Sequence, residues 1–284
     1  MKLYEIEKAL ASFGAENPRE EALIIAEELF GLGRAALMAD RERDFSSPEL
    51  DSLLEKRKER VPLQHIIGKW SFMGEEFFVS PQCLIPRPDT EILVEKAIEI
   101  IKKSRGVDDF GAKYRVADLC TGSGCIGLSL MMCGNLESVT LMDISSGALE
   151  MARKNALHHG LQNRCRFILG DITKDLPKER FDLIVSNPPY IPTKDIEGLS
   201  EEVKKEPMLA LDGGCDGLDI IRFLISDGLD YLKENGAMLI EFGFDQGEII
   251  NTLLRQKCDT GSIKSYEILY DYGKNPRVAV IWAN

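Results

Sequence analysis

The sequence predicts an α/β protein in which helices cover a mostly parallel sheet, with a small helical domain in front of it. From residue 115 onward, short apolar strands alternate with glycine-containing turns and helical segments, a pattern typical of such a sheet. Residues 1–60 show helical apolar spacing instead. The length of 284 residues suits two domains of this kind.

The N-terminal helices have recognisable beginnings. Asn17 precedes Pro18, and Glu20 follows three residues after the asparagine. This pattern predicts an N-cap, a proline in the first turn and a capping acid. Ser47 precedes another proline and predicts the start of a further helix. That helix reaches a charged run at residues 55–60, which we expect to be a solvated helix face.

Residues 61–86 differ in character from the helical segment before them. Aromatic and apolar residues surround Gly74, which predicts a β-hairpin. Three prolines then predict an extended linker, followed by a helix at residues 88–103. The chain is therefore expected to have three parts: a helical N-terminal domain at 1–75, a hairpin and linker at 76–90, and the α/β domain at 91–284.

The α/β domain begins with a strand, a glycine loop and a helix, and this order repeats. Strands are expected at 116–119, 139–142, 166–169, 181–185 and near 237–242, with helices at 126–132, 145–156 and near 220–232. The last two strands, at 266–270 and 278–282, are joined by so short a link that they predict an antiparallel hairpin. By fold-level analogy, an antiparallel strand at the end of this Rossmann-like sheet is typical of methyltransferases.

Composition excludes several classes of protein. The 47 acidic and 35 basic residues give a formal net charge of −12, which argues against a large nucleic-acid footprint. Seven cysteines and three histidines show neither Cys-x-x-Cys spacing nor a zinc pattern, so free thiols and no metal are expected. The N-terminus lacks a signal-peptide core, and no apolar run approaches the ~20 residues that span a bilayer. A cytoplasmic protein without membrane contact is expected.

A glycine loop at residues 118–127 follows the first strand of the α/β domain. Gly122, Gly124 and Gly127 form the G-x-G-x-x-G pattern, which permits a tight turn and a close approach of the backbone to a ligand. By itself this pattern does not choose between a nicotinamide cofactor and S-adenosylmethionine. The expected cofactor-binding residues in the loop are Cys120, Thr121, Gly122, Ser123 and Gly124.

Acidic residues follow the next two strands. Asp143 stands about 20 residues after the glycines, where a carboxylate can accept hydrogen bonds from both ribose hydroxyls. Asp171 and Ile172 follow the third strand. In methyltransferases an acid at this place typically contacts the adenine amino group, and an apolar neighbour covers the ring. The three positions together favour S-adenosylmethionine as the cofactor.

The motif Asn187-Pro188-Pro189-Tyr190 directly follows the fourth strand, where ligands of open α/β sheets lie. An amide nitrogen is a poor nucleophile, because its lone pair is delocalised into the carbonyl group. The Asn187 side-chain oxygen and the Pro188 carbonyl can each accept one N–H of such a group. The prolines fix the backbone, and the Tyr190 ring can lie against a planar acceptor. These four residues are the expected catalytic residues.

Further motifs resemble those of the release factor glutamine methyltransferase family over nearly the whole chain. They lie at residues 62–68, 84–91 and 206–218, and the segment 84–91 is the most specific to the family. The resemblance implies methylation of the glutamine in the Gly-Gly-Gln loop of peptide-chain release factors, with S-adenosylhomocysteine as the second product. It also implies that the N-terminal domain helps to hold the protein substrate, and it places Arg87 near the cofactor and acceptor channel.

Three alternatives stay open at this point. The first is an adenine-N6 methyltransferase of DNA or RNA, which needs the same pair of oxygen acceptors for a planar nitrogen. Such an enzyme must also bind phosphates, and the net charge of −12 argues against phosphate binding. A nicotinamide-dependent oxidoreductase would leave the motif at residues 187–190 unexplained. A non-catalytic adaptor of release factor or ribosome would leave both motifs without a use.

Overall fold

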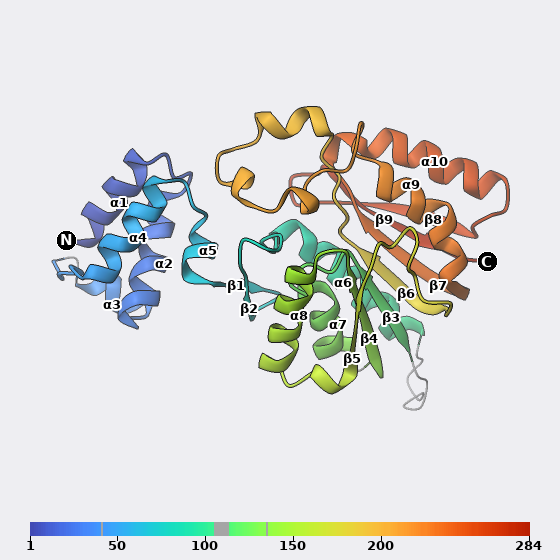
Figure 1. Ribbon diagram of the computed structural model, residues 1–284, viewed down its shortest axis with the longest axis horizontal. Coiled ribbons are helices and arrows are strands. Elements are labelled where there is room, and N and C mark those ends of the chain that lie inside the picture. Colours follow the sequence, from blue (N-terminus) through green and yellow to red (C-terminus); the bar gives the residue numbers. More distant parts are fainter. Residues whose placement is uncertain (41, 105–113, 135) are drawn as a thin grey trace. The chain divides into compact units, whose positions relative to one another are not determined.

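The computed structural model describes residues 1–40, 42–104, 114–134 and 136–284 (Figure 1). The chain forms two compact units: Met1–Lys69 with Ser200–Lys205, and Trp70–Leu199 with Glu206–Asn284. The expected domain boundary at residue 75 lies inside the second unit, because Phe72 and Phe77 are buried in the core of that unit. We call the two parts the N-terminal unit and the catalytic unit.

Short helices make up the N-terminal unit. Their apolar faces, including Ile6, Ile25 and Leu50, meet in one buried cluster. Ser47 accepts a hydrogen bond from the backbone N–H of Leu50, as expected of an N-cap. Asn17 makes no such side-chain bond, contrary to the pattern in the sequence. The helices are α1 (Leu3–Ser12), α2 (Pro18–Phe30), α3 (Arg34–Ala39), α4 (Pro48–Lys58) and α5 (Leu63–Ile67).

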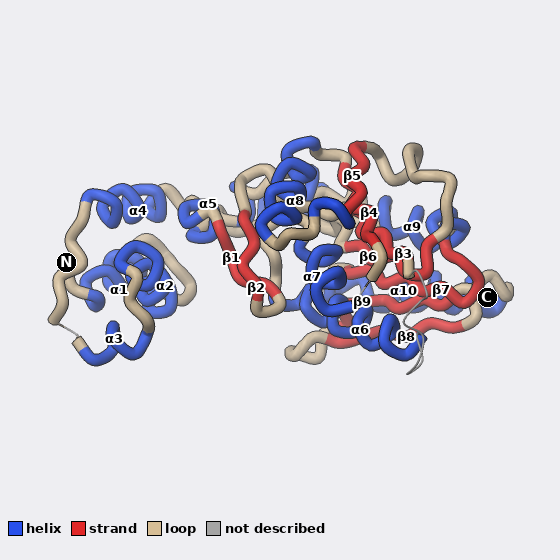
Figure 2. The backbone as a smooth tube through the Cα atoms, turned by 90° about the horizontal axis from the view of Figure 1, so that it is seen from below, coloured by secondary structure: helices blue, strands red, loops and turns tan. Residues whose placement is uncertain are grey.

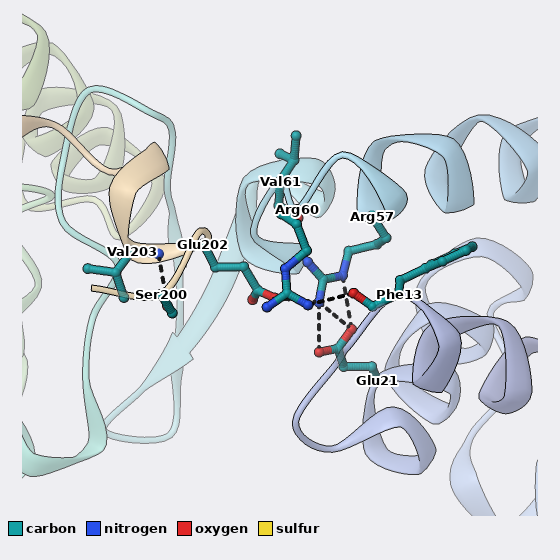
Figure 3. A network of polar contacts seen from close by, with 8 residues as sticks. All are labelled: Phe13, Glu21, Arg57, Arg60, Val61, Ser200, Glu202 and Val203. Carbon is teal, nitrogen blue, oxygen red and sulfur yellow. Dashed lines mark hydrogen bonds and ion pairs between the residues drawn. The ribbon is translucent and has the colours of Figure 1, made fainter. Parts of the chain in front are cut away.

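A buried arginine joins the helices of the N-terminal unit to the segment Ser200–Lys205 (Figure 3). Arg57, which is 1% exposed, donates to both carboxylate oxygens of Glu21 at 3.0 Å and to the Val61 carbonyl at 2.7 Å. It also donates to Glu202 at 3.2 Å, and Arg60 forms a second ion pair with Glu202 at 3.1 Å. Burial raises the pKa of Glu21, and Arg57 opposes this rise. The expectation of a solvated face at residues 55–60 is therefore wrong for Arg57.

The catalytic unit is built on a seven-stranded sheet in the order β5-β4-β3-β6-β7-β9-β8 (Figure 2). Its first five strands are parallel, and β9 is antiparallel to both of its neighbours. The expected C-terminal hairpin is confirmed, and its last strand lies between β7 and β8. The strands are β3 (Arg115–Leu119), β4 (Ser138–Asp143), β5 (Cys165–Leu169), β6 (Phe181–Ser186), β7 (Leu232–Glu241), β8 (Ser265–Tyr270) and β9 (Pro276–Trp282).

Helices cover both faces of the sheet because successive strand residues point to opposite sides. In β6, Leu183 and Val185 belong to one buried cluster, and Ile184 belongs to the other. The first cluster includes residues of α6 (Pro88–Ser104), α7 (Cys125–Gly134) and α8 (Ser146–His158). The second includes residues of α9 (Asp219–Ile225) and α10 (Gly247–Asp259). These layers leave the loops at the ends of the strands free to form a site.

The expected β-hairpin is confirmed as β1 (Lys69–Phe72) and β2 (Glu75–Phe78). The buried side chain of Asn155 in α8 exchanges hydrogen bonds with the backbone of Phe78, at 2.7 and 3.0 Å. Its amide also donates to the Ser123 carbonyl at 2.8 Å. The hairpin is thus tied to the glycine loop, which explains why it belongs to the catalytic unit.

Candidate active site

A cavity of about 350 Å³ opens at the carboxyl ends of the parallel strands. β3 lies between β4 and β6, so the loops that follow these strands converge there. Among the expected site residues, Gly124, Pro188 and Tyr190 do not line this cavity. Those that do line it are Arg87, Cys120, Thr121, Gly122, Ser123, Asp143, Asp171, Ile172, Asn187 and Pro189.

The loop after β3 makes a tight turn at the cavity wall. Cys120 and Gly122 have φ angles of 61° and 56°, in the left-handed region. The fully buried carboxylate of Asp118 holds both sides of the turn, because it accepts bonds from the Thr121 hydroxyl at 2.6 Å and the Gly127 N–H at 2.9 Å. Burial raises the pKa of Asp118 to about 7, and these two hydrogen bonds oppose the rise.

Two of the three fingerprint glycines serve close packing behind the loop. A Cβ at Gly127 would lie 2.4 Å from Leu141 Cδ2. A Cβ at Gly124 would lie 3.1 Å from side-chain atoms of Ala152 and Leu128. Close packing therefore requires small residues at positions 124 and 127. Gly124 supports the glycine loop and does not line the cavity.

Asp143 is the last residue of β4, and its carboxylate connects the glycine loop to the loop that follows β4. Its Oδ2 accepts the Gly122 N–H and its Oδ1 accepts the Ser145 N–H, both at 2.8 Å. Burial raises its pKa, and these backbone bonds oppose the rise. Each carboxylate oxygen keeps a second lone pair, so Asp143 can also accept bonds from a diol in the cavity.

Asp171 and Ile172 form the wall that follows β5. The Asp171 carboxylate accepts bonds from Lys174 at 2.7 Å and from the backbone and hydroxyl of Thr173 at 2.9 and 2.7 Å. Lys174 and Thr173 hold the pKa of Asp171 at about 2. Ile172 is 4% exposed and presents apolar surface beside this charge. An acceptor next to an apolar wall suits a purine ring.

Asn187 lines the cavity from the loop after β6. Its Nδ2 donates to the Thr90 hydroxyl at 3.2 Å. Its Oδ1 is buried and has no hydrogen-bond donor among the residues that the structure describes. A buried acceptor without a donor is costly in a folded protein, so its presence in a cavity wall indicates a ligand N–H or O–H.

The end of the motif at residues 187–190 is held by the side-chain amide of Gln246 and by close packing against Gly217. The Gln246 side chain donates to the carbonyls of Tyr190 at 2.9 Å and Gly217 at 3.2 Å. A Cβ at Gly217, whose φ is 76°, would lie 2.2 Å from the Tyr190 carbonyl oxygen. The Tyr190 hydroxyl lies 3.4 Å from Oε1 of Glu241, and burial raises the pKa of Tyr190. The ring packs against the second core cluster, and its contact with an acceptor stays a prediction.

Arg87 lies in the cavity wall, where the family resemblance places it. Its guanidinium forms an ion pair with Glu206, a carboxylate with a side chain only 1% exposed. Glu206 also accepts the backbone N–H of Ile85 at 2.9 Å. One buried carboxylate therefore holds both the backbone of residues 85–87 and the arginine beside the cavity.

Sequence reasoning did not identify several residues that build the site. The sequence contained a signal for Asp118 and Glu241, because each is an acid in or directly after a short apolar run near the carboxyl end of a strand. The others became visible only through their contacts; they are Thr90, Asn155, Glu206 and Gln246. In the described part of the chain, no cluster of histidine, cysteine and acidic side chains suits a metal ion. Across the same residues, no helix combines the length and the apolar character that crossing a bilayer requires.

Two protein-family models match the chain. A PrmC N-terminal domain matches residues 3–68, and a methyltransferase small domain matches residues 98–205. The chain is also similar to the release factor glutamine methyltransferase of Moorella thermoacetica, at 37% identity over 97% of this chain and 95% of that protein. The enzyme of the same name from Geobacter sulfurreducens is 39% identical over 85% of this chain and 82% of its own.

Solved structures show the same fold at low sequence identity. A methyltransferase from Pyrococcus furiosus has a TM-score of 0.53 and 18% identity, over 80% of this chain and 98% of that one. The N-terminal domain of human METTL16 in complex with SAH has a TM-score of 0.52 and 16% identity, over 73% and 75% of the two chains. These likenesses confirm the Rossmann-like methyltransferase sheet.

Proposed function

Because the chain belongs to the release factor glutamine methyltransferase family, we propose that it methylates the glutamine of the Gly-Gly-Gln loop in peptide-chain release factors. The methyl group comes from S-adenosylmethionine and joins the side-chain amide nitrogen of that glutamine. The observation that carries the proposal is the Asn187 side chain, which lines the cavity and whose buried oxygen has no donor among the described residues.

The residues of the cavity suit the two reactants. Asp143 accepts the ribose hydroxyls of S-adenosylmethionine, and Asp171 with Ile172 receives the adenine. The Asn187 oxygen accepts one N–H of the glutamine amide. The carbonyl of Pro188, which is next in the chain but does not itself line the cavity, is the proposed acceptor of the other N–H. These two bonds turn the nitrogen towards the methyl group.

Methyl transfer breaks the sulfonium S–C bond and forms an N–C bond. The sulfur keeps the electron pair and leaves as S-adenosylhomocysteine, and the nitrogen loses one proton to solvent. Positive charge develops on the nitrogen in the transition state, so two preorganised oxygen acceptors bind the transition state more strongly than the ground state. This difference accelerates the reaction.

The direct test supplies labelled S-adenosylmethionine with three acceptors in separate reactions. These are a release factor, the same factor with Glu in place of the loop glutamine, and duplex DNA or RNA rich in adenine. We expect label on the first acceptor alone. Label on nucleic acid without label on the release factor would show that the motif at residues 187–190 holds an adenine, and the protein would then be an adenine-N6 methyltransferase.

Replacement of Asp143 by alanine tests the cofactor site. We expect the Asp143→Ala protein to bind S-adenosylmethionine about 10-fold to 150-fold more weakly, because a charged hydrogen bond contributes about 1.5–3 kcal/mol. Calorimetric titration measures this affinity. Asp259→Ala, an exposed acid at the end of α10, is the matched control. Equal affinity in a folded Asp143→Ala protein would remove Asp143 from the cofactor site.

We further propose that the N-terminal unit holds the release factor during the reaction. A chain that begins at Lys69, the first residue of β1, keeps the hairpin that Asn155 ties to the glycine loop. We expect this shortened chain to keep its affinity for S-adenosylmethionine and its activity on a Gly-Gly-Gln peptide. Transfer to the intact release factor should fall by about 10-fold or more, since a docking contact of ~1.4 kcal/mol already gives this factor. Equal turnover of the intact factor by both chains would exclude the docking role.

A further inference from the structure

The segment at residues 84–91 carries part of the family resemblance, yet the reaction described above uses none of its residues. In the structure its polar side chains have partners within the catalytic unit. Thr90 differs from the others because its partner is the Asn187 amide itself. The other pairs are Arg87 with Glu206, Asp89 with Arg277, and Glu91 with the Met73 N–H.

Thr90 lies between Asn187 and Glu241. Its side chain is 2% exposed, and its hydroxyl oxygen lies 3.2 Å from Asn187 Nδ2. The Glu241 carboxyl, which is 1% exposed, lies near enough to Thr90 for this hydroxyl to lower the pKa of the carboxyl. The three side chains come from α6, the loop after β6 and the end of β7. They form a connected row of polar groups inside an apolar core.

The chemistry of these groups sets the direction of each hydrogen bond. An ionised carboxylate only accepts, so between these two groups the Thr90 hydroxyl can act only as the donor, with its single proton directed to Glu241. The hydroxyl oxygen can then only accept from Asn187, which fixes the NH₂ of the amide towards Thr90. The Asn187 oxygen must therefore point away from Thr90. Without the hydroxyl, the amide can turn by half a rotation and present NH₂ to the substrate.

The charges around Glu241 favour this arrangement. Burial raises the pKa of Glu241 to about 7, and the Asp89 charge adds to this rise. Thr90, Arg277 and the Tyr190 hydroxyl oppose it. Above pH 7 the carboxyl is therefore mostly ionised and acts as the acceptor at the end of the row. Assays at pH 8 keep it in this state.

We propose that Thr90, anchored by Glu241, is the positioning residue that makes Asn187 present an oxygen to the methyl acceptor. The inference rests on the proposed function, because it assumes that the acceptor is an amide with N–H bonds to donate. Thr90 acts through Asn187 and needs no contact with the reacting atoms.

The test compares Thr90→Val, which removes the hydroxyl at nearly constant volume, with Thr90→Ser, which keeps it. At pH 8 we expect Thr90→Val to lower kcat for the release factor by about 10-fold to 100-fold, as for a buried donor that loses its acceptor. Its affinity for S-adenosylmethionine should stay unchanged, and Thr90→Ser should recover most of the loss. Thr252→Val, an exposed hydroxyl of α10, is the matched control.

A second readout separates orientation from a general loss of structure. The release factor with Glu in place of its loop glutamine offers an acceptor-only carboxylate, which the Asn187 oxygen repels. The parent enzyme should bind the glutamine form more tightly than this competitor. In Thr90→Val the amide can turn, so the preference should shrink by about 10-fold. A merely structural role would weaken both forms alike.

Parental turnover and parental preference in a folded Thr90→Val protein would overturn the inference. If Thr90→Val does not fold, Thr90→Ala removes the same hydroxyl without added bulk. We expect the same loss of kcat and the same smaller preference for the glutamine form from Thr90→Ala. An inactive parent on every release factor would instead overturn the proposed function, and the two failures are thereby distinguished.

Discussion

Asn187→Ala should bind S-adenosylmethionine like the parent and transfer its methyl group to release factor about 10²-fold to 10³-fold more slowly. The reason is that alanine removes one preorganised acceptor for the charge that develops on the amide nitrogen, and a loss of this kind costs such a factor. The residues proposed to contact the cofactor do not include Asn187, so the affinity for S-adenosylmethionine should not change. Single-turnover transfer and calorimetric titration on the same preparation measure both quantities.

Asn251→Ala is the matched control for this experiment. Asn251 also uses its side-chain oxygen as an acceptor, from the Tyr266 hydroxyl at 2.9 Å, but it lies in α10 away from the cavity. Near-normal transfer by a folded Asn187→Ala protein would refute the clamp and leave the motif as a turn after β6. A loss of cofactor affinity equal to the loss of rate would place Asn187 in the cofactor site.

Arg57→Ala should lower the free energy of unfolding of the N-terminal unit by about 3–5 kcal/mol. Removal of one partner of a buried ion pair leaves an uncompensated charge, and losses of this size are typical. Glu21 and Glu202 would both lose their shared cation. A urea titration followed by circular dichroism measures the loss. Hydrogen exchange should also accelerate in the segment Ser200–Lys205, because its ion pair to Arg57 is gone.

Arg34→Ala provides the comparison within the same unit. Arg34 pairs with Glu20 and Glu27, but its side chain is 52% exposed, so solvent screens these pairs and little stability should be lost. Equal unfolding midpoints for Arg57→Ala and the parent would show that burial of this arginine contributes nothing. Slow exchange at residues 200–205 in Arg57→Ala would show that other contacts hold the segment.

Much of the fold could be predicted because periodicity reports burial directly. Leu183 and Val185 pack in one core and Ile184 in the other. A strand that is buried on both faces in this way appears in the sequence as an unbroken apolar run. The place of the glycine loop and Asp143 beside the cavity was predictable for a related reason, since they follow strands and the carboxyl ends of parallel strands share one edge of the sheet.

The supports of the site could not be predicted, because their partners are distant in the sequence. Thr90 meets Asn187 across 97 positions, and Arg87 meets Glu206 across 119. No local pattern encodes such pairs. Arg57 was misjudged for the same reason: its neighbours in the run are charged and exposed, and only the folded chain brings Glu202 to it. The roles expected of Pro188 and Tyr190 in holding the acceptor stay predictions.

The membership of residues 200–205 in the N-terminal unit has a consequence for synthesis on the ribosome. Translation delivers Arg57 and Glu21 early, but Glu202 follows Arg57 by 145 positions. Domains generally fold as units in the order in which they emerge. Here the first unit to emerge remains incomplete until most of the catalytic sheet has been translated. Until residue 202 has been translated, Arg57 has Glu21 as an ion-pair partner but lacks Glu202. Chaperones that bind unfinished chains can act on the N-terminal helices during this interval.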